Sequence, residues 1–313
     1  MDRVTTFSSY NSVITSLMSS EVRMNQADVQ VSSGKIASDL KGFGANAEAL
    51  TAAQTLKTRV DTFVQNSQNL SNKLDAQNLA LTQVADAGSG ARQAIATAVA
   101  SGNADGLMSS LQSYFGQAAG GLNSQYNGHY LFAGGKVDTA PVAAKTLTDL
   151  TTTPPPGGVF QNDQLAPTSQ LDESTNLQTG MLADGVGTNL FNAFAAVEAF
   201  DQGPGGPLTG NLTSAQEAFL TSMMPTFDTA NKAMTSSVAA NGLVQNRVSQ
   251  SLSTQQDRQT LLETTIGSIT DVDMAQASSR LSQAQVALQA AAKIFASLQN
   301  STLLSAFTPG VNG

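Results

Sequence analysis

A heptad repeat between residues 56 and 98 constrains the fold of this chain more than any other feature. Apolar side chains recur there at alternating steps of four and three residues, which keeps one face of a long helix turned toward a partner. The predicted helix is a rod of roughly 60 Å, at a rise of about 1.5 Å per residue; a helix in an ordinary globular bundle is the alternative. The repeat positions are Leu56, Val60, Phe63, Ser67, Leu70, Leu74, Gln77, Leu81, Val84, Gly88, Ala91, Ile95 and Ala98.

Both ends of the chain carry the same pattern. Between residues 274 and 307 only Arg280 and Lys293 are charged, so a helix there needs a partner in water, and the N-terminal repeat is the natural candidate. Thr270 and Asp273 have the spacing of a capping box at the start of this helix, with Asp271 as the alternative N-cap. We expect the assembly interface to consist of Val13, Leu17, Met24, Val31, Met274, Ala277, Leu281, Ala284, Leu288, Ala291, Phe295 and Leu298.

The middle of the chain has a different character. Residues 137–210 are rich in Pro, Thr and Gly and lack heptads, so they predict short strands, with one helix over residues 189–200. This composition also suggests an autonomous insertion on the outer surface. Helix is expected again over residues 214–266, with Pro225 as a candidate kink or break.

The predicted fold is mainly α. The N- and C-terminal segments are expected to form an elongated antiparallel coiled-coil rod, with a small, mainly β domain inserted in the middle. We divide the chain into terminal coiled-coil assembly segments, a helical rod and an outer insertion. Their respective ranges are 1–45 with 270–313, 46–136 with 211–269, and 137–210.

The composition excludes several classes of function. A net charge of −8 and a pI near 4.5 argue against a nucleic-acid partner, because phosphates require clustered Lys and Arg. The chain has no cysteine, so it has no disulfide or thiolate metal site, and no apolar run is long enough to insert into a membrane. The N-terminus lacks the apolar core of a signal peptide, which fits a cytosolic protein or export without cleavage.

No constellation of residues predicts catalysis, a cofactor or a metal. His129 is the only histidine, and neither a Gly-x-Ser-x-Gly elbow nor a cysteine nucleophile accompanies it. Residues 42–47 match a dinucleotide fingerprint in its Gly/Ala form, but heptad helix flanks them where a βαβ unit is required. A joint between two helices explains this glycine-containing segment better, and helix capping explains Asp271 and Asp273 better than cation binding does.

Several segments resemble those of bacterial flagellins. Residues 31–36, Val-Ser-Ser-Gly-Lys-Ile, are similar to the segment that closes the first flagellin helix. Residues 268–275, Ser-Ile-Thr-Asp-Val-Asp-Met-Ala, are similar to the entry of the flagellin C-terminal helix. Leu303 and Leu304 fit the closing signature, and residues 241–246 contain the Gly and Asn of the returning helix.

Within that family, residues 126–134, Tyr-Asn-Gly-His-Tyr-Leu-Phe-Ala-Gly, resemble the hook-associated branch found at the hook–filament junction. The opening residues 3–6 resemble the same branch, and residues 39–44 lack the acidic pair that filament flagellins usually have after their Ser-Ser-Gly segment. The family-motif residues are Ser33, Gly34, Gly128, Tyr130, Phe132, Gly134, Asp271 and Asp273.

The resemblance implies a non-enzymatic structural subunit of the extracellular flagellum, secreted through the flagellar type III channel. It implies self-association, contacts with the hook-side junction protein and with flagellin, an export chaperone, and terminal helices that become ordered on assembly. A filament flagellin is the alternative function. An adhesin-like module is a third hypothesis, although residues 137–210 show no aromatic cluster that could stack on sugar.

Overall fold

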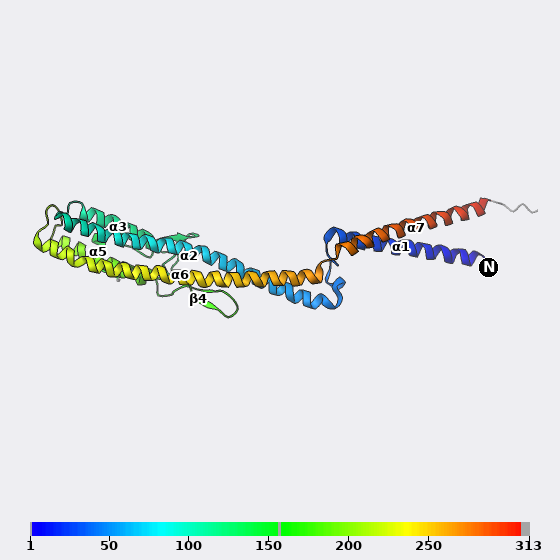
Figure 1. Ribbon diagram of the computed structural model, residues 1–313, viewed down its shortest axis with the longest axis horizontal. Coiled ribbons are helices and arrows are strands. Elements are labelled where there is room, and N and C mark those ends of the chain that lie inside the picture. The colour runs from blue at the N-terminus through cyan, green and yellow to red at the C-terminus, as the bar shows by residue number, and fades with distance from the viewer. Residues whose placement is uncertain (1, 156–157, 308–313) are drawn as a thin grey trace, which may run out of the picture. The chain divides into compact units, whose positions relative to one another are not determined.

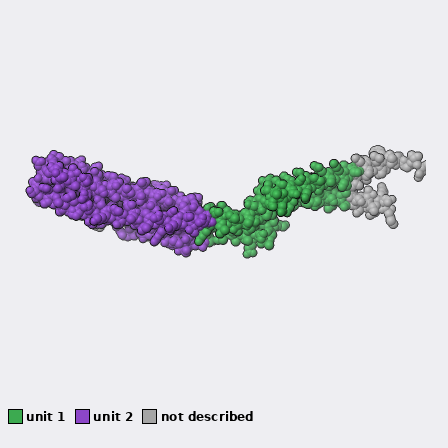
Figure 2. Space-filling view, in the orientation of Figure 1, with its two compact units in different colours: residues 1–59, 258–313 green, residues 60–257 purple. Residues whose placement is uncertain are grey.

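The computed structural model describes residues 2–155 and 158–307, and describes side chains for residues 11–155 and 158–297 (Figure 1). The chain forms two compact units (Figure 2). Unit 1 comprises residues 1–59 and 258–313, and unit 2 comprises residues 60–257. Two long helices, α2 (Ala47–Ser101) and α6 (Ser214–Thr270), contribute to both units.

Unit 1 joins the two ends of the described chain. Helix α1 (Asp2–Ser33) packs along α7 (Met274–Phe307), and Figure 1 shows the two helices side by side. A short 3-10 helix, η1 (Leu40–Asn46), follows α1 and contains a kink at Gly44, whose φ is +54°. This is the joint expected at the glycines of residues 42–44, because a positive φ is accessible to glycine at little cost.

Unit 2 is a bundle built on the antiparallel pairing of α2 with α6. The side-chain contacts show this antiparallel direction: Gln77 is bonded to Asn241, and Arg92, further along α2, is bonded to Asp228, earlier in α6. The predicted heptad face of α2 is fully buried from Ser67 to Ala98, whereas Leu56, in unit 1, is 47% exposed. Pro225 lies inside α6, which continues through it without a break.

Three further helices complete unit 2: α3 (Leu107–Leu122), α4 (Leu147–Thr152) and α5 (Ala183–Gln202). Strand β1 (Gln125–Tyr126) pairs with β2 (His129–Tyr130), and β3 (Thr168–Gln170) pairs with β4 (Asn176–Gln178), both antiparallel. The mainly α architecture is confirmed.

The segment 137–210 differs from the expected small β domain. It contains two three-residue strands but also α4 and all of α5, which begins six residues earlier than predicted. The rings of Phe191 and Phe194 are fully buried against Phe115 of α3, at centroid distances of 5.1 and 5.9 Å. Phe194 also meets Phe227 of α6. The segment therefore shares the main core of unit 2, because aromatic area this large is stable only when buried.

Candidate assembly surface

The heptad positions of α1 and α7 face each other in unit 1. The small side chains at the centre of the seam are buried, namely Ser20, Ala27, Ala277, Ala284 and Ala291. The larger ones are only half-buried: Val13, Leu17, Met24, Val31, Leu281, Leu288 and Phe295. Met274 is 47% exposed, and the side chain of Leu298 lies outside the described residues. Two helices that approach closely over alanine cannot enclose the large residues beside them.

A second apolar row runs along α1 on the side away from α7. It consists of Met18, Val22 and Val29, which are 60%, 54% and 47% exposed. These residues lie close to one helical face, and that face is roughly opposite the buried Ala27. On α7, Val286 and Ile294 are also more than half exposed. We name the Met18–Val22–Val29 row the outer row of α1.

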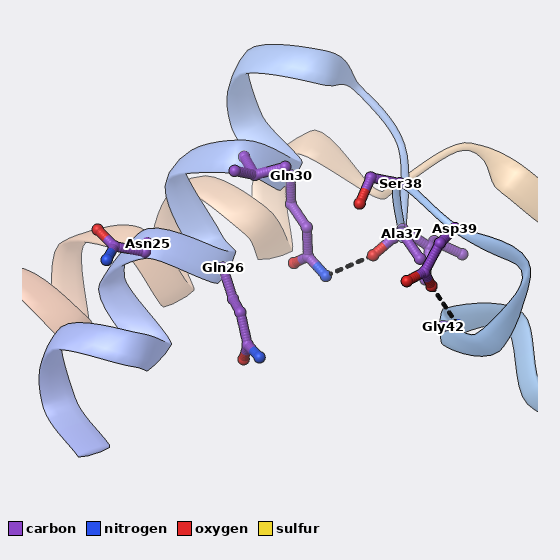
Figure 3. A pocket seen from close by; sticks show the side chains of 9 residues that line it. Asn25, Gln26, Gln30, Ala37, Ser38, Asp39 and Gly42 are labelled. Atoms are coloured by element: carbon purple, nitrogen blue, oxygen red, sulfur yellow. Dashed lines mark hydrogen bonds between the residues drawn. The ribbon is translucent and has the colours of Figure 1, made fainter. Parts of the chain in front are cut away.

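The outer row leads into a groove between α1 and the segment that follows it (Figure 3). The groove has a volume of about 520 Å³, and Val29 and Ile36 contribute apolar surface to it. Gln30 donates a hydrogen bond from Nε2 to the Ile36 carbonyl at 2.8 Å, and the Asp39 carboxylate accepts one from the Gly42 amide at 2.9 Å. The first bond ties the segment to α1, and the second is local to the turn that begins η1.

The first two family motifs meet in unit 1, although they are far apart in the sequence. Gly34 ends α1 with a φ of +69°, which is why this position suits glycine. Its carbonyl accepts a hydrogen bond from the Val272 amide at 2.9 Å, and the Ile36 amide donates to the Thr270 carbonyl at 2.7 Å. The Ser33 hydroxyl accepts a hydrogen bond from the Lys35 amide. A short antiparallel pairing thus ties the end of α1 to the start of α7.

Asp271 and Asp273 have separate roles at this pairing. Asp273 is the N-cap of α7, since its Oδ1 accepts hydrogen bonds from the amides of Ala275 and Gln276. Asp271 instead bonds Lys35 Nζ at 2.6 Å, and this hydrogen bond holds the pKa of the Asp271 carboxyl below its ordinary value. Thr270 is the last residue of α6, so the expected capping box with Asp273 is replaced by a single cap.

The third motif, residues 126–134, forms a hairpin in unit 2. Asn127 and Gly128 make its turn with positive φ angles of 52° and 82°. Tyr130 is half-buried, Phe132 is fully buried, and the Phe132 carbonyl accepts a hydrogen bond from the Ala183 amide. Gly134 has no room for a Cβ because Asp163 lies against it. The motif therefore joins the hairpin to the core.

Sequence reasoning did not identify the outer row or the long-range Lys35–Asp271 pair. Met18, Val22 and Val29 are spaced by four and seven residues, which is itself a heptad pattern. Their frame is offset from that of the predicted seam, so following the seam alone does not reveal them. Within the described residues, no three ligating side chains gather as a metal site. None of the described helices combines the length and apolar character needed to cross a bilayer.

Comparisons with known proteins agree with this architecture. Residues 224–307 match the family model of the bacterial flagellin C-terminal helical region. No curated protein matches the sequence. A structure assigned as a flagellar hook-associated protein from Vibrio parahaemolyticus aligns with a TM-score of 0.59 and 16% identity, covering 72% of this chain and 97% of that one. FlgL from Bacillus cereus aligns with a TM-score of 0.52 and 11% identity, covering 70% and 98%.

The two kinds of comparison bear on different parts of the conclusion. At these identities the solved structures establish the fold. The family model covers α6 from residue 224 onward and all of α7, the helix that packs on α1. Residues 224–307 therefore have the C-terminal helical region of bacterial flagellins, and the chain has the fold of flagellar hook-associated proteins.

Proposed function

We propose that this chain is a structural subunit of the bacterial flagellum that assembles through its α1–α7 pair, and that its place is the hook–filament junction. One observation carries the proposal. The helix pair leaves large apolar side chains uncovered on its seam and on the outer row of α1. Exposed apolar rows of this kind mark surfaces that another protein covers.

The charge pattern supports a surface made for packing rather than for solvent. Residues 274–307 contain only two charged side chains, so little electrostatic repulsion opposes close packing of many copies. Fully burying one side chain such as Met or Val contributes about 1.5–3 kcal/mol. Several half-covered side chains on each copy therefore supply a substantial driving force for association.

The position at the junction rests on the fold and on the hairpin of residues 126–134, which resembles the hook-associated branch. A filament flagellin is the second candidate, favoured by the match of residues 224–307 to the flagellin C-terminal region. We propose further copies of the chain, the hook-side junction protein and flagellin as partners. We also propose that the chain binds an export chaperone and is secreted to the extracellular flagellum. We assign no catalytic role and no cofactor.

An adhesin-like role has less support. The exposed hairpin of β3 and β4 is dominated by polar side chains, with Leu171 and Leu177 turned to the rod, where they pack with Leu70, Leu74 and Val248. The phenylalanines of residues 137–210 belong to the main core or pack against it. These contacts leave no aromatic platform for a sugar among the described residues of that segment.

Deletion of the gene followed by electron microscopy tests the proposal. A junction subunit predicts hooks without filaments and flagellin lost to the medium. An epitope-tagged chain that restores the deletion strain should then be scarce in sheared flagella and should label one band at the hook tip. Label along the whole filament, with high abundance, would favour the flagellin alternative. Normal filaments in the deletion strain, with no label on flagella, would refute both.

A further inference from the structure

One flank of the α1–α7 pair holds a second groove, with a volume of about 380 Å³. Arg23 reaches it from α1 and Arg280 from α7, and the amides of Gln26, Gln30 and Gln283 line it between them. Arg23 donates to the Ser20 hydroxyl, and Arg280 donates to the Gln276 side-chain oxygen. Among the side chains of residues 11–155 and 158–297, neither arginine has a carboxylate within ion-pair distance.

Such a groove has the chemistry of a carboxylate site. Two guanidinium groups present fixed donors that suit carboxylate geometry, and glutamine amides supply further donors. Two helices contribute the arginines, so the site depends on the α1–α7 pair and exists only where both ends of the chain are folded together. Both arginines are exposed, so a partner can reach them without rearrangement.

The opposite flank of the same helix pair is acidic. Glu21 and Asp28 are exposed and lie seven residues apart, hence on one face of α1. Residues 21 and 23 are two positions apart, which places their side chains about 200° apart around the helix. Relative to the buried Ala27, Glu21 and Asp28 therefore lie on one side and Arg23 on the other.

We propose that the arginine groove of one copy binds the Glu21–Asp28 flank of a second copy. This inference rests on the proposed function and specifies how neighbouring subunits meet. The two complementary surfaces lie on opposite flanks of one helix pair, so the contact is heterologous: each copy offers a groove on one side and an acidic flank on the other. Repeated addition of this kind closes into a ring or continues as a helix, according to the rotation between copies.

The occupant is a second copy because charge complementarity is available within the chain itself. Charged groups at such contacts set register and partner choice, and like charges placed opposite each other are strongly unfavourable. The outer row of α1 lies on a third face of the helix, between the two flanks, and is separate from this contact. A free carboxylate ligand or another axial protein in the groove is the competing outcome.

Charge reversal in two separate variants tests the contact. The groove variant carries Arg23→Glu and Arg280→Glu, and the flank variant carries Glu21→Arg and Asp28→Arg. Each is expressed in the deletion strain, and its amount in isolated flagella is measured against the amount exported. We expect incorporation of either variant alone to fall at least tenfold. A control with Lys145→Glu and Lys232→Glu, both exposed in unit 2, should incorporate normally.

Co-expression gives the decisive result. The groove variant has an acidic groove that fits the basic flank of the other variant, and its own acidic flank fits the other variant's basic groove. The two variants should therefore restore incorporation together, as should one chain carrying all four changes. Normal incorporation of either variant alone, or loss that neither combination repairs, would overturn the inference. If the unmodified chain is itself missing from flagella, the proposed function fails instead.

Discussion

The outer row of α1 can be tested without disturbing the fold. We consider the triple substitution Met18→Ser, Val22→Ser and Val29→Ser. These side chains lie on a helix surface, and serine has nearly the same helix propensity as valine, so the α1–α7 pair should keep its structure. If the row is covered by another subunit in the flagellum, the substitution removes apolar area that only assembly buries.

The magnitude follows from the exposed fractions. The three residues are 60%, 54% and 47% exposed, so about half of the burial energy of each remains to be gained on assembly. Complete burial of such side chains contributes about 1.5–3 kcal/mol each. The three together should therefore contribute about 2–4 kcal/mol per interface, which corresponds to a loss of roughly 30- to 1000-fold in subunit affinity.

The assay compares incorporation with export. The variant is expressed in the deletion strain, isolated flagella and culture medium are probed with the same antibody, and the ratio of the two signals is recorded. We expect normal export with the subunit lost to the medium. Thermal unfolding of the purified chain, followed by circular dichroism, should match that of the unmodified protein.

A matched control is available in unit 2, where Leu79 and Leu243 are 73% and 67% exposed. Their replacement by serine removes a similar exposed apolar area away from the helix pair and should leave incorporation unchanged. Normal incorporation of the triple variant would refute the reasoning, because the row would then face solvent in the assembly. Equal loss in the control would point to a general effect of removing surface leucine, valine or methionine.

Three further predictions follow from the same contacts. Leu288→Asp places a carboxylate in the half-buried seam and should abolish incorporation while leaving the urea unfolding of unit 2 unchanged. Phe191→Ala should destabilise unit 2 by about 3–5 kcal/mol in urea unfolding, whereas replacing residues 168–178 by a Gly-Ser bridge should cost less. The Asp271 carboxyl has a lowered pKa, so its contribution to stability is present above the ordinary value of 3.8 and is lost as pH falls through the folded value. The stability difference between Lys35→Met and the unmodified chain should therefore shrink in acid unfolding as the pH drops below about 4.

The long helices could be predicted because their signal is local and repeated. A heptad face reports burial against any partner, so the sequence indicated both the buried face of α2 from Ser67 to Ala98 and the seam from Ala277 to Phe295. The pairing of the two ends was inferred from the scarcity of charge in the last helix. Both inferences needed only local sequence, without knowledge of distant contacts.

The middle of the chain was harder to predict, since its structure depends on tertiary packing. Proline and glycine indicated short strands, but α5 begins at Ala183 and includes Gly187, which packs tightly against Leu122. Its phenylalanines complete a core to which α2, α3, α4 and α6 also contribute. Pro225 is accommodated inside α6, whose length and packing outweigh the local cost of proline.

The candidate surface was predicted in part. The seam residues followed from the heptads, but Met274 proved more exposed than its repeat position suggested. The Lys35–Asp271 pair joins residues 236 positions apart, and no local pattern reports such a contact. The outer row was missed because the prediction followed only one heptad frame of α1, and the second apolar face lies outside that frame.

The pairing of the first helix with the last imposes an order of events on folding. Closing a free loop of 236 residues between Lys35 and Asp271 costs about 5 kcal/mol of chain entropy. When Leu70 and Val248 have already met in the core of unit 2, only the short segments outside them remain to be closed, and the cost falls by about 1.3 kcal/mol. The pairing of α1 with α7 is then about tenfold more favourable. The helices that present the assembly surface therefore pair preferentially on chains in which unit 2 is already folded.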